Sequence, residues 1–499
     1  MFTPPISRSS TSSRSSATAG YGVSSYGPSS PAPSSPSLAS SLLSSSLGTS
    51  PLTNTLSSSV RRHSIYGTED RIVLDLGSFY LKCGFSGEPR PRHILQVSGQ
   101  VQDHQRTGAC DEACRKEGLF SPLHDIAIEE EDLPRLEAAL KHHLFRMYYQ
   151  LLLTDPRQRK VIVCERPLWP MPLKKLLMRL LFDHFQVPSI SFAPSHLLSL
   201  MTTGSTKGLV IDCGHLETTI LPVFDARPLF PYVASTVRAG KFLSKRLRRL
   251  LLTYASVSTH GRPIVESMLT DEAVEEIKTR LLFASPFRPM RGASDNSGAG
   301  EDEDEDGMGD SGENWMRDTS AATDVEIRLR TSSGESLDLL IPGWVRERAA
   351  ECLFDGDEDA PSITQIVLDT LLRLPIDLRM PMAENLLLAG GTAQLPNFQS
   401  RLHQDLIRTL QEDREVQGKY ASLSALVDTL LFVDGRDEQI RVFQPSCRAW
   451  VGGSLVGAVK TNGPEVTRAQ YDGTVPDWLA SPPTPPSDGP GREEGAGER

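Results

Sequence analysis

No apolar run of the chain approaches the roughly 20 residues that a membrane helix needs, so we expect no membrane span. The first residues, MFTPPISRSSTSS, lack the apolar centre of a secretory signal. Positive charge is also scarce, because 52 Lys and Arg face 63 Asp and Glu, for a net charge of -11 at pH 7. A broad basic surface that binds nucleic acid is therefore not expected.

Cysteine is sparse as well, with seven residues scattered over 499. This usage favours free thiols in a reducing compartment over a disulfide framework. Cys110 and Cys114 are four positions apart, but no second Cys or His pair lies close to them in the sequence. We therefore do not predict a zinc site there.

Three segments are poor in apolar residues, and we predict that they are disordered. Residues 1–68 are rich in Ser and Pro and contain no acidic residue. A mitochondrial transit peptide is a weaker interpretation of this tail, because Arg is sparse and Pro is frequent. Residues from about 288 to 324 are Gly, Ser and acid, which indicates a solvated insert or, alternatively, a docking site for a basic partner. The tail at 481–499 leaves 69–480 as the folded domain.

Within this domain, strand and helix patterns alternate. RKVIVCERP (159–167) and KGLVIDCG (207–214) have the apolar runs of buried strands. PLKKLLMRLLFDHF (172–185) has leucines at helical spacing, and ENLLLAGGTAQLP (384–396) is a strand that runs into a glycine turn. This order predicts an α/β fold with ligands at the carboxyl ends of the strands.

One supersecondary unit occurs twice. The repeated pattern is three apolar residues followed by Asp, any residue and Gly, and it occurs in IVLDLGSFYLKCGF and in LVIDCGHLETTILPV. Asp75 and Asp212 therefore hold equivalent places. The repeat predicts two similar α/β halves that face a cleft. Tight glycine turns let backbone amides approach phosphates, and carboxylates can hold the waters of Mg²⁺. Two facing hairpins could therefore clamp one phosphate chain.

A further glycine turn follows the apolar strand at Leu386–Leu388. Its residues Gly390, Gly391 and Thr392 could pack against a nucleoside, although an ordinary strand–helix loop has the same composition. We interpret a later pair, Gly452-Gly453, as a turn beside Trp450.

These motifs resemble the actin family in the order in which that family carries them. The match covers about residues 70–478 apart from the acidic insert. It is carried by LDLGSFYLKCGFSGEPRPR, VIVCERPLWP, FQVPSISFAPSHLLSLMTTGSTKGLVIDCG, NLLLAGGTAQLP, RAWVGGSLVGAV and AQYDG. The resemblance implies an actin-like ATPase fold, in which two duplicated lobes surround a nucleotide cleft.

The resemblance also implies which residues bind ATP or ADP with Mg²⁺. The residues that match the family's nucleotide loops are Asp75, Gly77, Ser78, Lys82, Asp212, Gly214, Lys278, Gly390, Gly391 and Thr392. Asp75 and Asp212 would hold the metal through water.

Four positions depart from the family's pattern. His215 and Leu216 stand where the second phosphate loop of actin continues with Asp and Gly. A neutral imidazole cannot replace a carboxylate beside magnesium-bound water, and we expect Leu216 to add bulk next to the phosphates. Ser195 and Thr219 replace the Gln and His that act on the attacking water. Because phosphoryl transfer depends on positioning and electrostatics, we expect binding with little or no hydrolysis.

The segment between Pro91 and Lys160 does not resemble the actin loop that enters the next filament subunit. A subunit with one disabled face ends a head-to-tail filament. Within the family, this pattern resembles the pointed-end actin-related subunit of dynactin, the activator of the dynein motor. The implied partners are subunits of the actin-like filament and the other pointed-end subunits, in the cytoplasm and at the cytoskeleton.

Two other functions remain open. A nuclear actin-related subunit of a chromatin-remodelling complex would share these motifs, and SKRLRRLL (244–251) could be its nuclear address. However, leucines at helical spacing make this segment look like a basic-faced surface helix. A sugar-kinase or Hsp70-like ATPase would share the fold, but no carboxylate stands out as the catalytic base of a kinase.

Overall fold

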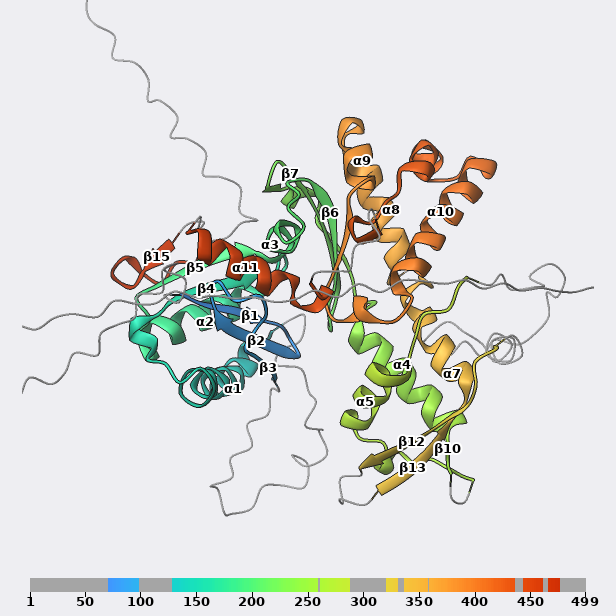
Figure 1. The fold of residues 1–499 in the computed structure, drawn as a ribbon, viewed down its shortest axis with the longest axis horizontal. Coiled ribbons are helices and arrows are strands. Elements are labelled where there is room, and N and C mark those ends of the chain that lie inside the picture. Colours follow the sequence, from blue (N-terminus) through green and yellow to red (C-terminus); the bar gives the residue numbers. More distant parts are fainter. Residues whose placement is uncertain are drawn as a thin grey trace, which may run out of the picture. The chain divides into compact units, whose positions relative to one another are not determined.

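In the computed structural model, the two repeated hairpins belong to two different sheets (Figure 1). The described residues are 71–97, 128–258, 261–287, 320–330, 336–357, 359–435, 443–460 and 465–475. They all belong to one compact unit of the chain, Arg62–Arg499. Several predicted features lie outside the described residues: the two tails, the insert up to residue 319, and the pair Cys110 and Cys114. The predicted limits of the folded domain therefore stay predictions.

The first lobe is built on a six-stranded sheet with the order β15-β5-β4-β1-β2-β3. Its strands are β1 (Arg71–Leu76), β2 (Tyr80–Phe85), β3 (His93–Gln96), β4 (Lys160–Glu165), β5 (Ser189–Pro194) and β15 (Glu465–Thr467). Its helices are α1 (Leu133–Phe145), α2 (Met171–Arg179), α3 (Ser195–Met201) and α11 (Arg448–Val459). The helix predicted at residues 172–185 is confirmed, and both α1 and α2 end in a wider π-helical turn, at Arg146–Leu151 and Leu180–His184.

Strand β1 contributes to a core on each face of this sheet, because successive side chains of a strand point to opposite sides. Ile72 and Leu74 pack in the cluster that contains the leucines of α1 and α2. Val73 lies in a separate cluster with Leu198 of α3 and Trp450 of α11. The sheet is therefore covered on both faces, as its continuous apolar strands predict.

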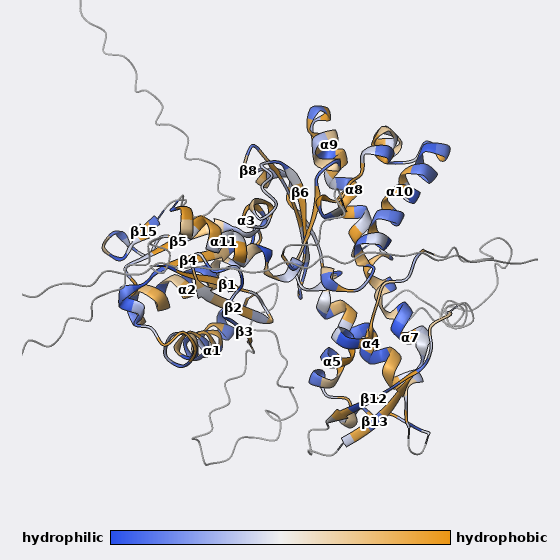
Figure 2. Cartoon of the chain, viewed as in Figure 1, coloured by the Kyte–Doolittle hydropathy of each residue, from blue (hydrophilic) through white to orange (hydrophobic). Residues whose placement is uncertain are grey.

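The second lobe is built on the sheet β14-β6-β7-β8, with β9 also paired to β7. Its strands are β6 (Gly208–Cys213), β7 (Thr218–Phe224), β8 (Arg227–Pro228), β9 (Ala234–Thr236) and β14 (Leu386–Ala389). Its helices are α4 (Gly240–Tyr254), α5 (Asp271–Leu281), α7 (Gly343–Arg348), α8 (Ile363–Arg373), α9 (Ile376–Ala383) and α10 (Phe398–Val416). Figure 2 shows that β6 is mostly hydrophobic, whereas α10 carries both hydrophilic and hydrophobic residues.

A small antiparallel sheet, β11-β10-β13-β12, lies beyond α4 and α5 in this lobe (Figure 1). Its strands are β10 (Ser256–Val257), β11 (Arg262–Pro263), β12 (Val325–Arg330) and β13 (Ser336–Ile341). The segment SKRLRRLL lies within α4, where Leu247, Leu250 and Leu251 are buried. The predicted helix is thus confirmed, although one of its basic residues, Arg246, is also only 5% exposed.

The duplication inferred from the sequence is present in the strand pairing. β1 pairs antiparallel with β2 and parallel with β4, and β6 pairs antiparallel with β7 and parallel with β14. In the first hairpin Asp75 is opposite Lys82, and in the second Asp212 is opposite Thr219. The predicted fold of two similar lobes is confirmed.

Helices α3 and α11 pack directly on each other where the chain passes between the two sheets. α3 follows β5 of the first sheet and precedes β6 of the second. A Cβ atom at Gly452 would overlap the backbone of Leu198. The indole Nε1 of Trp450 donates to the Val73 carbonyl at 3.0 Å, which fixes α11 on β1. Our interpretation of Gly452-Gly453 as a turn is wrong, because both glycines lie inside α11. Gly452 permits the close packing on α3, and Gly453 lies against Val73 and Cys164 of the first sheet.

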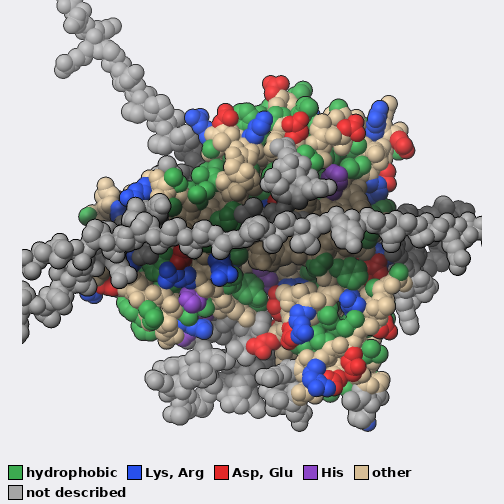
Figure 3. All heavy atoms as spheres, in the orientation of Figure 1, with side chains coloured by type: hydrophobic (Ala, Val, Ile, Leu, Met, Phe, Trp, Pro, Cys, Tyr) green, Lys and Arg blue, Asp and Glu red, His purple; other side chains and the backbone are tan. Residues whose placement is uncertain are grey.

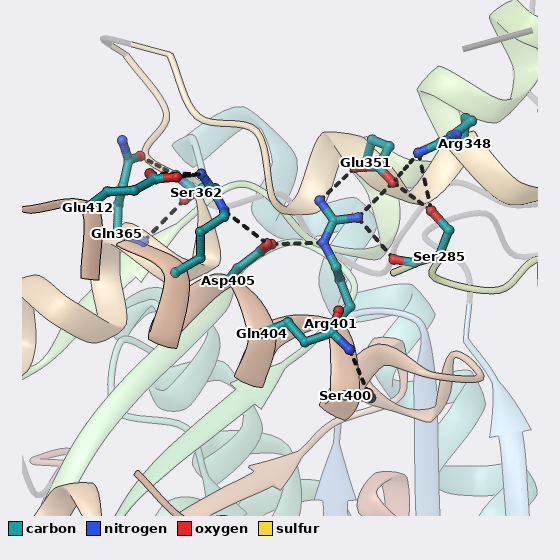
Figure 4. A network of polar contacts seen from close by, with 11 residues as sticks. Ser285, Arg348, Glu351, Ser362, Gln365, Ser400, Arg401, Gln404, Asp405 and Glu412 are labelled. Atoms are coloured by element: carbon teal, nitrogen blue, oxygen red, sulfur yellow. Dashed lines mark hydrogen bonds and ion pairs between the residues drawn. The ribbon is translucent and has the colours of Figure 1, made fainter. Parts of the chain in front are cut away.

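A buried ion network holds the chain just before the insert (Figure 4). The Arg401 guanidinium of α10 donates to the Ser285 carbonyl at 3.0 Å and to Glu351 at 2.8 Å. It also bonds Asp405 at 2.9 Å, and Arg348 reaches the Ser285 hydroxyl at 3.3 Å. Charges this deeply buried need such mutual pairing, because an unpaired one would be strongly destabilising.

One arginine of α7 joins the two ends of the insert. Arg346 donates to the Leu281 carbonyl, before the insert, and to the Thr323 carbonyl, among the last residues of the insert, at 3.3 and 2.8 Å. The second end is held further where Asp324 accepts from the Gly343 amide at 2.8 Å. Both ends of the insert are therefore fixed on α7.

The described surface is mixed in charge. On the face drawn in Figure 3, acidic and basic side chains are interspersed. Among the described residues, no helix is both long and apolar enough to cross a membrane. The described cysteines are all buried and unbridged: Cys83, Cys164, Cys213, Cys352 and Cys447.

The substitution Gly452→Ala tests the contact between α11 and α3. Alanine favours a helix over glycine by about 1 kcal/mol, so a purely local effect would stabilise the protein. We expect the opposite, a loss of about 3 kcal/mol in the free energy of unfolding, because the added methyl group meets backbone that cannot yield. Denaturant unfolding measures this change. Leu455→Ala, on the exposed side of the same helix, is the control and should change stability by only about 0.5 kcal/mol.

Candidate functional site

A cavity of about 510 Å³ is lined by residues of both lobes, within the range of small-molecule sites. Every residue that the sequence assigned to nucleotide binding lines it: Asp75, Gly77, Ser78, Lys82, Asp212, Gly214, Lys278, Gly390, Gly391 and Thr392. The structure thus brings the predicted residues together. Their role in nucleotide binding stays a prediction.

The first hairpin places an ion pair at the cavity. Lys82 Nζ lies 2.6 Å from Asp75 Oδ2, and both side chains are largely buried. Burial disfavours the ammonium, but the Asp75 carboxylate outweighs this effect and raises the pKa of Lys82 above its usual value. Lys82 therefore stays charged, and part of its charge is already neutralised by Asp75.

The second hairpin brings Asp212 to the same cavity, and the glycine turn after β14 fits closely against it. Gly390 has φ = +88°, and a Cβ there would overlap both the Cys213 carbonyl and the Asp212 carboxylate. Thr392 Oγ1 donates to the Gly214 carbonyl at 2.7 Å. The Gly-Gly-Thr turn is therefore fixed directly on the second hairpin, which favours the functional interpretation over that of an ordinary loop.

Lys278 of α5 reaches the cavity from the α4–α5 pair. Its Nζ donates to the Ser244 hydroxyl at 2.9 Å and pairs with Glu275 at 2.5 Å. Glu275 lines the cavity as well, together with Tyr80 and Arg166. We did not single out these three residues from the sequence, because nothing in their local motifs distinguishes them from surface residues.

Of the two residues that follow Gly214, His215 lines the cavity and Leu216 does not. The ring of His215 stacks on Phe79 of the first hairpin, with centroids 4.5 Å apart and planes at 22°. Burial, together with Lys278 and Lys241, lowers the pKa of His215 to about 3, so the imidazole is neutral. Leu216, which we expected to add bulk beside the phosphates, is 4% exposed and does not line the cavity. Phe79, which the sequence analysis missed, contributes the bulk instead.

The two positions at which the family's water-directing Gln and His are replaced are connected by a buried histidine. His196 Nε2 lies 3.1 Å from Thr219 Oγ1 and 3.3 Å from the Thr219 carbonyl, while Nδ1 lies 3.2 Å from Ser195 Oγ. A carbonyl can only accept, so we place the proton on Nε2, which leaves Nδ1 to accept from the Ser195 hydroxyl. Burial lowers the pKa of His196, which keeps the ring neutral. Ser195 lines the cavity, but its hydroxyl proton points to the imidazole.

The donor set is consistent with a magnesium nucleotide. Asp75 and Asp212 come from opposite hairpins and line one cavity, where their carboxylates could hold metal-bound water. The described residues contain no group of three or more His, Cys, Asp or Glu that would bind a metal directly. The backbone at Gly391 is open, since a Cβ there would meet nothing within 4 Å, and Lys82 and Lys278 supply positive charge.

Comparison with known proteins supports the same relationship. The family model described as Actin matches residues 67–284 and 339–480. The chain belongs to the actin family. This membership confirms the resemblance inferred from the phosphate-loop and C-terminal motifs.

Two kinds of actin-family relative align with most of the chain. Actin-related protein 10 of Dictyostelium discoideum is 24% identical over 431 residues, which cover 78% of this chain and 82% of the relative. Actin-related protein 2 of Oryza sativa subsp. indica is 22% identical over 423 residues, which cover 80% of this chain and 95% of the relative. The protein of subsp. japonica gives the same values.

The adjacent glycines of the third loop provide a matched pair of variants. Gly390→Ala should displace the Asp212 carboxylate and strain a left-handed residue, with a loss of about 1–3 kcal/mol in stability. Gly391→Ala should be almost neutral, because a Cβ there meets nothing within 4 Å. Thermal unfolding and magnesium-nucleotide titration would compare them. Equal effects of the two variants would contradict this account of the turn.

The stacked imidazole predicts a specific pH dependence. The folded-state pKa of His215, about 3, lies below its ordinary value of 6.5. The contribution of the neutral, stacked imidazole to the free energy of unfolding is therefore complete above pH 6.5 and is lost as the pH falls toward 3. His215→Phe should reduce the acid sensitivity of unfolding in this window by about 1.4 kcal/mol per pH unit. Denaturant unfolding between pH 6.5 and 4.5 measures it. His142→Phe, on the exposed side of α1, should follow the wild type.

Proposed function

We propose that this chain is a non-enzymatic actin-related structural subunit that caps the pointed end of the dynactin actin-like filament and supports dynein-driven transport along microtubules. It acts in the cytoplasm, at the cytoskeleton, with filament subunits and the other pointed-end subunits as partners. It holds ATP or ADP with Mg²⁺ as a structural ligand in the cleft.

The main support is that the phosphate-loop residues of both lobes line one cavity while the groups that would aim water at a phosphate are altered. Ser195 is short, and its hydroxyl proton is directed to His196. Thr219 carries no ring and contacts the same imidazole. Positioned groups supply most of the catalysis of phosphoryl transfer, so these changes reduce turnover more than binding.

The pointed-end role rests on the resemblance given above, since most of the altered segment between Pro91 and Lys160 lies outside the described residues. The alignment with an actin-related protein over 78% of the chain supports a role within this branch of the family. The nuclear alternative is weakened by the structure, because SKRLRRLL is part of α4 and its leucines are committed to the core.

Two measurements on the purified full-length chain test this proposal. With Mg-ATP, we expect phosphate release far slower than that of filamentous actin assayed beside it. An equal rate would refute the non-enzymatic assignment. Affinity purification read by mass spectrometry should recover subunits of the dynein activator. Recovery of chromatin-remodelling ATPases instead would establish the nuclear alternative.

A further inference from the structure

The two phosphate loops touch each other through aromatic rings. Phe79 lies in the turn between β1 and β2, and His215 lies in the turn between β6 and β7. Their rings are stacked with centroids 4.5 Å apart, and Phe79 is only 3% exposed. This contact joins the two lobes at the tips of the hairpins that would otherwise face each other across a phosphate chain.

Each ring is held in place by its own lobe. The Val97 amide donates to the Phe79 carbonyl at 2.9 Å, and the Lys241 amide donates to the His215 carbonyl at 2.6 Å. The Tyr80 ring packs edge-on against Phe79, with centroids 4.9 Å apart. A ligand group could enter between the rings only by displacing residues that are anchored on both sides.

The loops offer few groups for an additional phosphate. The Gly77 amide donates to the Tyr80 carbonyl at 2.9 Å, and the Gly214 amide donates to the Glu217 carbonyl at 3.0 Å, so both are used within their turns. Both lysines that line the cavity are paired with carboxylates, Lys82 with Asp75 and Lys278 with Glu275. His215 adds no positive charge, because its imidazole is neutral.

From this geometry, and resting on the proposed nucleotide site, we propose that the Phe79–His215 stack is a specificity element that selects a nucleoside diphosphate over a triphosphate. The rings fill the space between the loop tips, where the end of a longer phosphate chain would lie. A diphosphate leaves the stack intact. A triphosphate must separate the rings and bring further negative charge close to Asp75 and Asp212, where the carboxylates repel it.

Calorimetric titration tests this inference. The full-length chain, stripped of nucleotide, is titrated with ADP or with ATP, each with Mg²⁺. We expect the wild type to bind ADP at least tenfold more tightly than ATP. Phe79→Gly should raise the affinity for ATP at least tenfold and change that for ADP less than threefold. His215→Ser removes the stack from the other lobe and should act in the same direction, which protects the test if one variant does not fold.

The control is Ile376→Ala, which alters an exposed residue of α9 that does not line the cavity and should keep the wild-type preference. A wild type that binds ATP as tightly as ADP would overturn the inference but leave the nucleotide site standing. If Phe79→Gly and His215→Ser both keep the wild-type preference for ADP over ATP, the inference is likewise overturned and the nucleotide site still stands. A wild type that binds neither nucleotide would overturn the site itself, and the inference with it.

Discussion

The contact between α11 and α3 fixes the segment that links the two sheets onto a helix of the first sheet. The two helices meet at backbone distance, because Gly452 leaves no side chain between them. α3 connects the two sheets, and α11 is fixed on the first sheet through Trp450 and Val73. Since both hairpins start from sheets that share this junction, their turns end at one cavity, and the site depends on the junction.

At that cavity, the chain gathers charged and polar side chains but satisfies many of them internally. Lys82 pairs with Asp75, Lys278 pairs with Glu275, and the Ser195 hydroxyl is taken by His196. A buried, fully paired polar network is rigid and costly to rearrange. Such a site suits a ligand that stays bound and supports the fold better than one that is turned over.

Much of the fold and of the cavity lining could be predicted from the sequence, because repeated and local patterns indicate them. The duplicated Asp-x-Gly hairpins predicted two lobes, and the glycines at Gly390 and Gly391 marked a turn that a Cβ at the first position would disrupt. The Phe79–His215 stack could not be predicted, since the repeat marks two hairpins far apart in the chain but does not say that side chains of their turns meet. The same holds for Gly452, because a glycine pair within a helix and one in a turn look alike until the partner helix is known.

The anchoring of the insert has a consequence for how this chain can diversify. Arg346 bonds both flanking segments, at Leu281 and Thr323, and Arg401 holds Ser285 from α10. The described residues on either side of the acidic stretch are thus held by bonds to the rest of the lobe, and they need not move when the length of that stretch changes. Loop-closure entropy grows only slowly with length, so this is the place where evolution, or a protein engineer adding a fluorescent label, can lengthen the chain with little effect on the cleft.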